Sequence, residues 1–187
     1  MVEITKKYKI GTRRFGLVNW YGTWTLYVKE VLRFLNVWAQ TLFSPLISSL
    51  LFLLVLSLAI GTERGEVLGV SFITFLAPGL IAMQIIQQAF SHSSSSLMIK
   101  KIDGTIVDLL FAPLSASEAT IAISLAAVTR SVLLAIISII TFTLIIDIQI
   151  QNYLTLISFT LLSSFILGNI GIIAGLWAEK FDHMATV

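Results

Sequence analysis

The sequence predicts an all-α integral membrane protein with four spans, and three observations support this fold class. Of the 187 residues, 57% are hydrophobic and only 12% are charged, whereas about a quarter of the residues in a soluble domain are charged. The apolar residues gather in four blocks, each long enough to cross a bilayer as a helix. Barrel strands would instead alternate over about ten residues, which no block does. Because lipid cannot hydrogen-bond an open sheet edge, the spans are expected to be helices.

Residues 1–36 are predicted to be a cytosolic basic tail followed by an amphipathic helix at the membrane interface. On a helical wheel, one face of this helix carries Trp20, Trp24, Tyr27, Val31, Phe34, Leu35 and Trp38. The other face carries Lys29, Arg33 and Asn36. Aromatic rings opposite basic groups are typical of a helix that lies in the head-group plane. The predicted interfacial anchors are therefore Trp20, Trp24, Lys29 and Arg33, and a simple aromatic belt is the alternative.

The transmembrane domain, residues 37–187, is predicted to contain four helical spans. They cover about residues 37–60, 67–90, 119–146 and 153–178. Ser44-Pro45 and Pro78-Gly79 interrupt the first two spans and are candidates for kinks or broken helices. In the fourth span, a small-residue face predicts close helix packing; it consists of Gly168, Gly171 and Gly175.

Ten of the twelve basic residues fall on one side of this topology. Seven precede the first span, and the other three are Lys100, Lys101 and Lys180. The loops on the opposite side contain only Arg64, and Arg130 lies inside the third span. Cytosolic loops are enriched in Lys and Arg, so both termini are predicted to be cytosolic. The first apolar block is too long and begins too late to be a cleaved signal peptide.

The connection 91–118 is predicted to be a cytosolic coupling loop that contains a short amphipathic helix. One narrow face of this helix would carry Ile102, Ile106, Leu109 and Leu110, away from Lys100, Lys101, Gly104 and Asp108. Pro113 would end the helix, and the spacing of Ser115 and Glu118 predicts a capping box for the third span. An exposed aliphatic face in a loop indicates a docking partner. A solvated loop with an incidental apolar face is the alternative.

The polar residues inside the spans each allow two interpretations of their role. Gln84, Gln88, Ser91 and Ser95 recur at helical spacing in the second span. The first three are a possible substrate path, and hydrogen bonds to neighbouring helices would explain the stripe equally well. From Arg130, the rest of the third span extends about 24 Å, less than a bilayer core, which places this residue in the inner leaflet. Its guanidinium is predicted to anchor the helix by reaching lipid phosphates or a cytosolic carboxylate, and a substrate site is the alternative.

Catalytic and metal-binding motifs are absent from the sequence. It has no cysteine, its two histidines lie far apart, and it has neither an HExxH motif nor a Gly-rich phosphate loop. We therefore expect no catalytic residue, no metal and no cofactor bound by this chain. The energy for any active process would have to come from another subunit.

Four segments, in order along nearly the whole chain, resemble a known family. They are residues 33–45 at the first span, 75–80 in the second, 108–115 in the long connection and 178–182 after the fourth. In this combination the chain resembles the membrane subunits of ABC-2-type ATP-binding-cassette transporters. The resemblance is strongest to the small bacterial permeases that are encoded beside a separate ATPase.

The resemblance implies a homodimeric permease of the bacterial plasma membrane that exports a substrate. Two cytosolic ATPase subunits would bind ATP and Mg²⁺, membrane lipid would be a further partner, and no nucleic acid is expected. In that family, the interfacial helix and the loop between the second and third spans contact the ATPase. Carried onto this chain, the candidate coupling surface is Lys100, Lys101, Asp103, Gly104, Ile106, Asp108, Leu109, Leu110, Pro113, Leu114 and Glu118.

Members of that family usually have six spans, whereas four are predicted here. The chain is therefore expected to be a truncated frame or a fragment that does not transport alone. The small-residue face of the fourth span is then expected to pack against a later helix. A second hypothesis is a four-span scaffold or assembly subunit that moves no substrate. A neighbouring ATPase gene, or two further spans encoded downstream, would favour the permease.

Reporter fusions test the predicted topology. A phosphatase fused after Val187 should be inactive because that end of the chain is predicted to be cytosolic. The same phosphatase inserted in the loop 147–152 should be active, which provides the matched control. External phosphatase activity from the Val187 fusion would contradict the topology and the cytosolic assignment of the connection 91–118.

Overall fold

The computed structural model describes residues 18–64, 66–67, 69–146 and 152–179. Its elements are α1 (Trp20–Leu35), a π-helix (Ala39–Phe43), α2 (Ser44–Arg64), β1 (Glu66–Val67), β2 (Val70–Ser71), α3 (Phe72–Ile102), α4 (Ile106–Phe111), α5 (Ala116–Ile145) and α6 (Tyr153–Trp177). The predicted basic tail before position 18 lies outside the described residues, as do Lys180 and both chain ends. Their cytosolic location stays a prediction.

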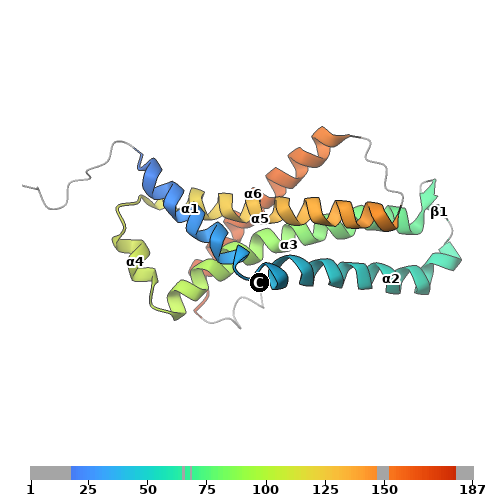
Figure 1. The fold of residues 1–187 in the computed structure, drawn as a ribbon, viewed down its shortest axis with the longest axis horizontal. Coiled ribbons are helices and arrows are strands. Elements are labelled where there is room, and N and C mark those ends of the chain that lie inside the picture. Colours follow the sequence, from blue (N-terminus) through green and yellow to red (C-terminus); the bar gives the residue numbers. More distant parts are fainter. Residues whose placement is uncertain (1–17, 65, 68, 147–151, 180–187) are drawn as a thin grey trace, which may run out of the picture.

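Within the described residues, four helices are long and apolar enough to span a membrane. This confirms the all-α fold class (Figure 1). The third and fourth spans correspond to α5 and α6, within three residues of the predicted bounds. α6 begins at Tyr153 because the Asn152 side chain caps it. The amide oxygen of Asn152 accepts hydrogen bonds from the N–H groups of Leu154 at 3.0 Å and Thr155 at 3.2 Å.

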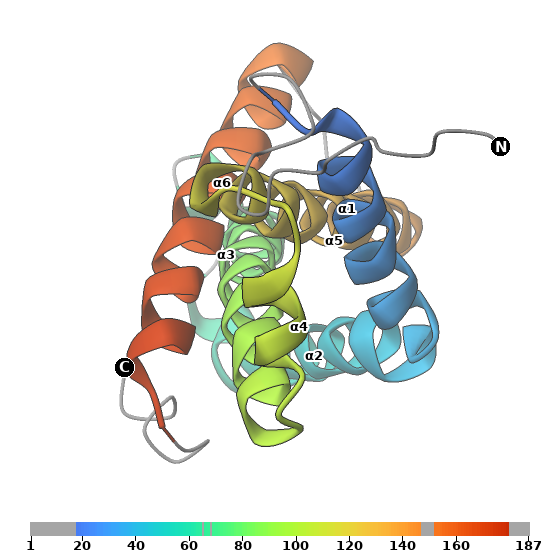
Figure 2. The ribbon, with the colours of Figure 1, turned by 90° about the vertical axis from the view of Figure 1, so that its left-hand side faces the viewer.

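Helix α3 forms the centre of the bundle. Viewed along the long axis of the molecule, α2, α5 and α6 lie around it (Figure 2). One apolar cluster joins α3 to α2 and α5; its buried members are Leu46, Leu53, Ala77, Leu80, Ile81, Ile85, Ala135 and Phe142. Packing against α2 and α5 therefore fixes the part of α3 that contains Gln84, which lies between the cluster members Ile81 and Ile85.

Helix α6 packs against α3 through the predicted small-residue face. A Cβ atom at Gly171 would lie 2.5 Å from the carbonyl oxygen of Phe90, and one at Gly175 would lie 2.8 Å from that of Ser94. The third member, Gly168, faces Ala127 of α5. The prediction of close packing is confirmed. The expectation that a later helix is the partner is wrong, because α3 and α5 of the same chain already fill this face.

The bounds of the second span differ most from the prediction. The helix begins at Phe72 because the β1–β2 hairpin, with Gly69 at φ +79°, occupies the preceding residues. At its other end α3 continues to Ile102, so residues 91–102 belong to the helix and not to the coupling loop. The run of serines at 93–96 suggests a polar loop in the sequence, but Ser93, Ser94 and Ser96 are buried between helices. The loop is thereby reduced to residues 103–115.

The two intramembrane prolines have different effects. The π-helix ends immediately before Ser44-Pro45, so the predicted irregularity lies at the start of the first span. Thr41 in the π-helix donates its hydroxyl to the carbonyl oxygen of Phe34 at 3.1 Å, which ties this segment to the end of α1. By contrast, α3 continues through Pro78, so a broken helix at that position is wrong.

Replacing Gly171 with alanine should destabilise the fold, because the new methyl group would meet the α3 backbone. Overpacking of this kind costs about 1–3 kcal/mol. Gly79→Ala is the matched control, since a Cβ there has no neighbour within 4 Å. That variant should be neutral, or stabilising by up to about 1 kcal/mol. Thermal unfolding of the detergent-solubilised protein measures both, and equal midpoints for the two variants would contradict the α3–α6 packing.

Candidate functional site

The start of α1 is connected by hydrogen bonds to the start of α5 and to the loop that precedes it. The Asn19 N–H donates to Glu118 Oε1 at 2.7 Å, and the Asn19 side-chain amide donates to the Pro113 carbonyl oxygen at 3.1 Å. Glu118 also accepts from the Ser115 N–H, while the Ser115 hydroxyl oxygen accepts from the Glu118 N–H. The predicted capping box is therefore confirmed. Because Glu118 is buried in these contacts, its inclusion in an exposed coupling surface is wrong.

A buried ion cluster joins α1 to the last turns of α3. Glu30, which is 1% exposed, accepts hydrogen bonds from Lys100 Nζ, from Ser96 Oγ at 2.7 Å and from Arg33 Nε at 3.1 Å. Arg33 also donates to the backbone carbonyl oxygen of His92 at 3.3 Å. Burial raises the pKa of Glu30, but Lys100 and Arg33 outweigh that effect and lower the pKa from 4.5 to about 2. The carboxylate is therefore charged at neutral pH.

Sequence reasoning missed Glu30 and misplaced two of its partners. Lys100 was expected in the coupling surface, away from the apolar face of the loop, but it is buried beside Glu30, so that placement is wrong. Arg33 is paired with the same carboxylate and is not a free anchor for lipid. The available signal was that Glu30 is the one acidic residue between Glu3 and Glu63. A lone carboxylate in a basic, aromatic helix indicates a specific cationic partner.

Helix α1 crosses the bundle obliquely at the end that carries α4 (Figure 1), and it buries a different face from the one expected: Thr23, Leu26, Glu30 and Phe34. Trp20 and Trp24 are 76% and 64% exposed, as interfacial anchors would be, and Lys29 is exposed as well. Phe34 instead packs against the His92 ring in a T-shaped arrangement, with ring centroids 5.6 Å apart. The prediction that the aromatic residues of α1 form a single lipid-facing stripe is therefore wrong. The placement of α1 in the head-group plane stays a prediction.

Helix α4 has one apolar face turned inward and another turned outward. The inward residues Ile106 and Leu109 pack against Leu97, Ile123 and Ile172. The outer α4 face consists of Val107, Leu110 and Phe111, which are 47%, 76% and 84% exposed. The expectation that Ile106 and Leu109 have no covering element is therefore wrong. The chain changes direction at Gly104, whose φ of +72° lies in the left-handed region that glycine adopts readily. This turn separates α3 from α4 and allows Ile106 and Leu109 to face the bundle.

The remaining predicted coupling residues differ in accessibility. Asp103, Gly104, Asp108 and Pro113 are exposed. Lys101 is not free, since Nζ donates to the backbone carbonyl oxygens of Leu176 and, at 2.9 Å, Ala178 at the end of α6. A groove of about 340 Å³ separates α1 from α4, and its lining includes Lys29, Asp108, Leu109, Pro113 and Leu114.

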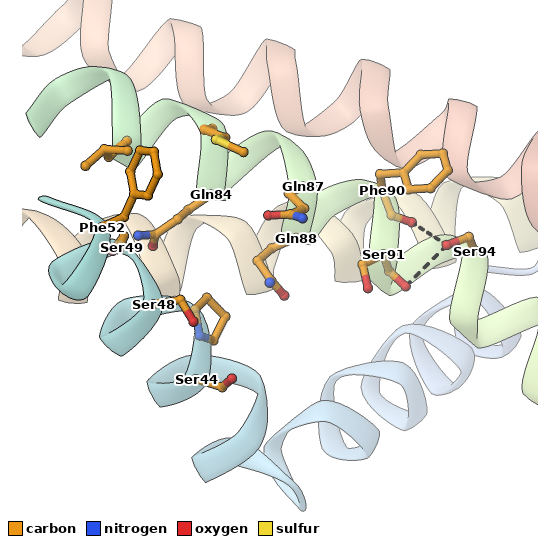
Figure 3. A pocket seen from close by; sticks show the side chains of 13 residues that line it. Ser44, Ser48, Ser49, Phe52, Gln84, Gln87, Gln88, Phe90, Ser91 and Ser94 are labelled. Carbon is orange, nitrogen blue, oxygen red and sulfur yellow. Dashed lines mark hydrogen bonds between the residues drawn. The ribbon is translucent and has the colours of Figure 1, made fainter. Parts of the chain in front are cut away.

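The residues of the predicted substrate path lie in an open cavity of about 730 Å³ between α2 and α3 (Figure 3). Gln84, Gln88 and Ser91 all line it. Other lining residues are Gln87 and Ser94 of α3 and Ser44, Ser48, Ser49 and Phe52 of α2. The last residue of the stripe, Ser95, is outside the lining and donates to the His92 carbonyl oxygen of its own helix at 3.2 Å. A role in substrate passage stays a prediction.

Arg130 lies inside the bundle and not at the lipid surface. It is 8% exposed, and Nη2 donates to the side-chain oxygen of Gln88. The predicted anchoring to lipid phosphates is therefore wrong. Counting residues along α5 indicates depth in the membrane, but it does not reveal that an amide of α3 is close enough to bind the guanidinium.

These features define a polytopic helical membrane protein with a cavity between two spans that is lined by serine and glutamine side chains beside apolar ones, and with an apolar face on a loop helix. In the part of the chain that the structure describes, no group of His, Cys, Asp and Glu side chains could hold a metal ion. The chain belongs to the ABC-2 type transporter family, whose model matches residues 21–187.

The sequence is also similar to curated proteins that are named as transport permeases. It is 26% identical over 168 residues to the inner membrane transport permease YadH of Escherichia coli K12, and the alignment covers 90% of this chain and 66% of that protein. The YadH proteins of Escherichia coli O157:H7 and Shigella flexneri match with the same values. The chain thus spans about two thirds of the length of these relatives. No solved structure matches it.

Glu30→Gln should strongly destabilise the protein, because it leaves Lys100 buried without its counter-charge. Removing one partner of a buried ion pair costs about 3–5 kcal/mol. The double variant Glu30→Gln, Lys100→Gln should recover much of that loss. Lys29→Gln, at the exposed neighbouring position, is the matched control and should change stability by less than about 0.5 kcal/mol.

Thermal unfolding across a pH series measures these effects. The pKa of Glu30 is lowered by folding, so its contribution is present above pH 4.5 and is lost as the pH falls towards 2. The difference between wild type and Glu30→Gln should therefore shrink over that range. Equal unfolding temperatures for Glu30→Gln and Lys29→Gln at neutral pH would show that the ion cluster does not stabilise the fold.

Proposed function

We propose that this chain is the membrane subunit of an ABC transporter in a bacterial inner membrane, where ATP hydrolysis by a separate subunit drives substrate export. Membership of the ABC-2 type transporter family supports this proposal, as does similarity to proteins named inner membrane transport permease. The functional unit would contain a second copy of the chain. The ATPase subunits would bind ATP and Mg²⁺, and the chain itself would supply no catalytic residue.

The outer α4 face is the observation that carries the coupling part of the proposal. Val107, Leu110 and Phe111 expose a continuous apolar surface on a helix of six residues. The neighbouring Asp103 and Asp108 are exposed too, so this apolar surface has a polar rim. Apolar surfaces of this kind on solvent-exposed loops are typical of protein contacts. A groove on a cytosolic ATPase is a partner of suitable chemistry.

The inner contacts of α4 provide a route from that surface to the spans. Ile106 and Leu109 pack against a cluster with members from α3, α5 and α6. The loop that follows α4 is bonded to α1 through Asn19 and the Pro113 carbonyl oxygen. A displacement of α4 by a docked ATPase would therefore displace helices of the bundle and α1 together.

The proposed orientation places α4 in the cytosol with both termini. The excess of Lys and Arg on that side of the predicted topology supports it. The exposed rings of Trp20 and Trp24 would then lie at the inner membrane interface, where such rings are favoured.

Leu110→Glu should reduce the amount of ATPase that co-purifies with the permease. The variant would place an unpaired carboxylate in an apolar contact, which costs several kcal/mol. Leu110 is a better test position than Leu109, because Leu109 packs inside the chain and its replacement would disturb the fold. Thr105→Glu is the matched control, since it adds the same charge at the exposed start of α4.

The measurements are recovery of the ATPase on a tagged permease and its ATP hydrolysis in vesicles. Leu110→Glu and Phe111→Glu should lower both, while membrane insertion and the behaviour of Thr105→Glu stay normal. Unchanged recovery and hydrolysis in both outer-face variants would contradict the coupling role. That result would favour the non-transporting scaffold.

A further inference from the structure

His92 of α3 is a fully buried histidine whose ring is not hydrogen-bonded. Its side chain has no exposed surface, and among the residues that the structure describes neither Nδ1 nor Nε2 has a partner. One nitrogen of a neutral imidazole is a donor and the other is an acceptor. Leaving such atoms unpaired inside a protein is unfavourable. Because water does not reach the enclosed ring, a partner for His92 has to come from a neighbouring side chain.

Glu30 of α1 is the neighbour that can provide this partner. Its Oε2 atom lies 4.0 Å from His92 Nε2, about 1 Å beyond the length of a hydrogen bond. The Phe34 ring packs against the imidazole, and Arg33 is bonded to the backbone carbonyl oxygen of His92 and not to its ring. A small change in the side-chain torsions of Glu30, or a small shift of α1, would close the gap to Nε2.

Three polar residues of α3 form a row beside this carboxylate. His92, Ser96 and Lys100 follow one another at intervals of four residues, which places them about 6 Å apart on one side of the helix. Ser96 Oγ donates to Oε2 of Glu30 at 2.7 Å, and Lys100 Nζ donates to Oε1. The carboxylate thus lies at the Ser96–Lys100 end of the row. If it turned towards the other end, Ser96 would remain its partner and His92 would replace Lys100.

Lys100 has a second environment that could accept it. It lines the groove between α1 and α4 together with Asp108. Movement of the Lys100 side chain into this groove would bring its ammonium group towards another carboxylate and towards solvent. Arg33 Nε, which donates to Glu30 at 3.1 Å, would remain as the counter-charge of Glu30. Neither member of the Glu30–Lys100 pair would then be left as an isolated buried charge, the arrangement that is most unfavourable.

We propose that His92 is the alternative partner of Glu30, and that the exchange of partners is a conformational switch. In the second state, His92 Nε2 donates to the Glu30 carboxylate and Lys100 lies in the groove beside Asp108. Glu30 belongs to α1, which continues through the π-helix into α2, so the switch links the groove at α4 to the position of the first span. The link to ATPase docking rests on the proposed function. The pairing itself depends only on residues of this chain.

A double-variant cycle tests the pairing without any ATPase, using reversible unfolding of the full chain by SDS in mixed micelles. In the wild-type background, His92→Phe replaces an unpaired polar ring with an apolar ring of similar shape and should leave stability unchanged or raise it. In the Lys100→Met background, Glu30 turns to His92. The same replacement should then raise the unfolding equilibrium constant about tenfold, the effect of one hydrogen bond to a charged group. Equal effects of His92→Phe in both backgrounds would show a packing role only and would overturn the proposal.

Two further variants complete the cycle. Ser93→Ala is the matched control, because the Ser93 hydroxyl is also buried and unbonded among the described residues but lies near Gly168 of α6. Its effect should be the same in both backgrounds. His92→Gln keeps a donor near the position of Nε2 and should restore much of the stability that His92→Phe loses in the Lys100→Met background. If His92→Gln were as unstable there as His92→Phe, the hydrogen bond to Glu30 would be overturned.

NMR of the full chain with isotope-labelled histidine detects the switch directly, and it decides the question if Lys100→Met does not fold. A proton on Nε2 that is bonded to a carboxylate resonates further downfield than an unbonded one. Lys100→Met should show the bonded signal, and wild type should show exchange between a major unbonded and a minor bonded state. Loss of a signal in His92→Gln distinguishes His92 from His183, the other histidine of the sequence. Only the unbonded signal in every folded protein would overturn the proposal.

The link to coupling has its own measurement. In vesicles that contain the ATPase, His92→Phe should lower ATP hydrolysis severalfold while recovery of the ATPase on the permease stays normal, and His92→Gln should restore hydrolysis. Normal hydrolysis in His92→Phe would overturn the link to coupling. A chain that shows the pairing but recruits no ATPase would support the switch and count against the proposed function, because neither the cycle nor the NMR signal needs a partner subunit. The two failures are therefore distinguishable.

Discussion

The buried carboxylate of Glu30 is the constraint on which the arrangement around α4 depends. A charge that is almost fully buried requires compensating charges and donors, and Lys100, Ser96 and Arg33 supply them. These contacts fix the rotation of α1, so that Phe34 turns inward while Trp20 and Trp24 stay outside. The opposite end of α1 is hydrogen-bonded to the start of α5. The helices around α4 are therefore connected at two places, one at each end of α1.

The spans could be predicted from the sequence because hydrocarbon imposes the same requirement on every residue of a crossing segment. The start of α5 was predictable for a different reason, since a capping box is a local interaction between Ser115 and Glu118. The second span was harder. Ser93, Ser94 and Ser96 are polar, yet they lie in a buried part of the bundle where a composition average suggests a loop. Whether a polar side chain is buried depends on its neighbours in space.

The candidate site shows the same limit. Helical spacing placed Gln84, Gln88 and Ser91 on one face, and they do share a cavity. The partner of Arg130 is Gln88, 42 residues away in the chain, and no local pattern indicates such a pairing. The small-residue face of α6 was correctly predicted to pack closely, but its partner had to come from the tertiary fold. The sequence thus indicates which faces make contact, and the structure identifies the partners.

The last turn of α3 has a mechanical consequence. Neighbouring residues on a helix point about 100° apart, so the adjacent cations Lys100 and Lys101 extend to different sides of α3. One binds Glu30 of α1 and the other binds carbonyl oxygens at the end of α6. Rotation of this turn about the helix axis would pull on α1 and α6 at the same time. The rotations of α1, α3 and α6 are therefore coupled at this end of the bundle. If one of these helices rotated alone, an ionic or charge-assisted contact would break.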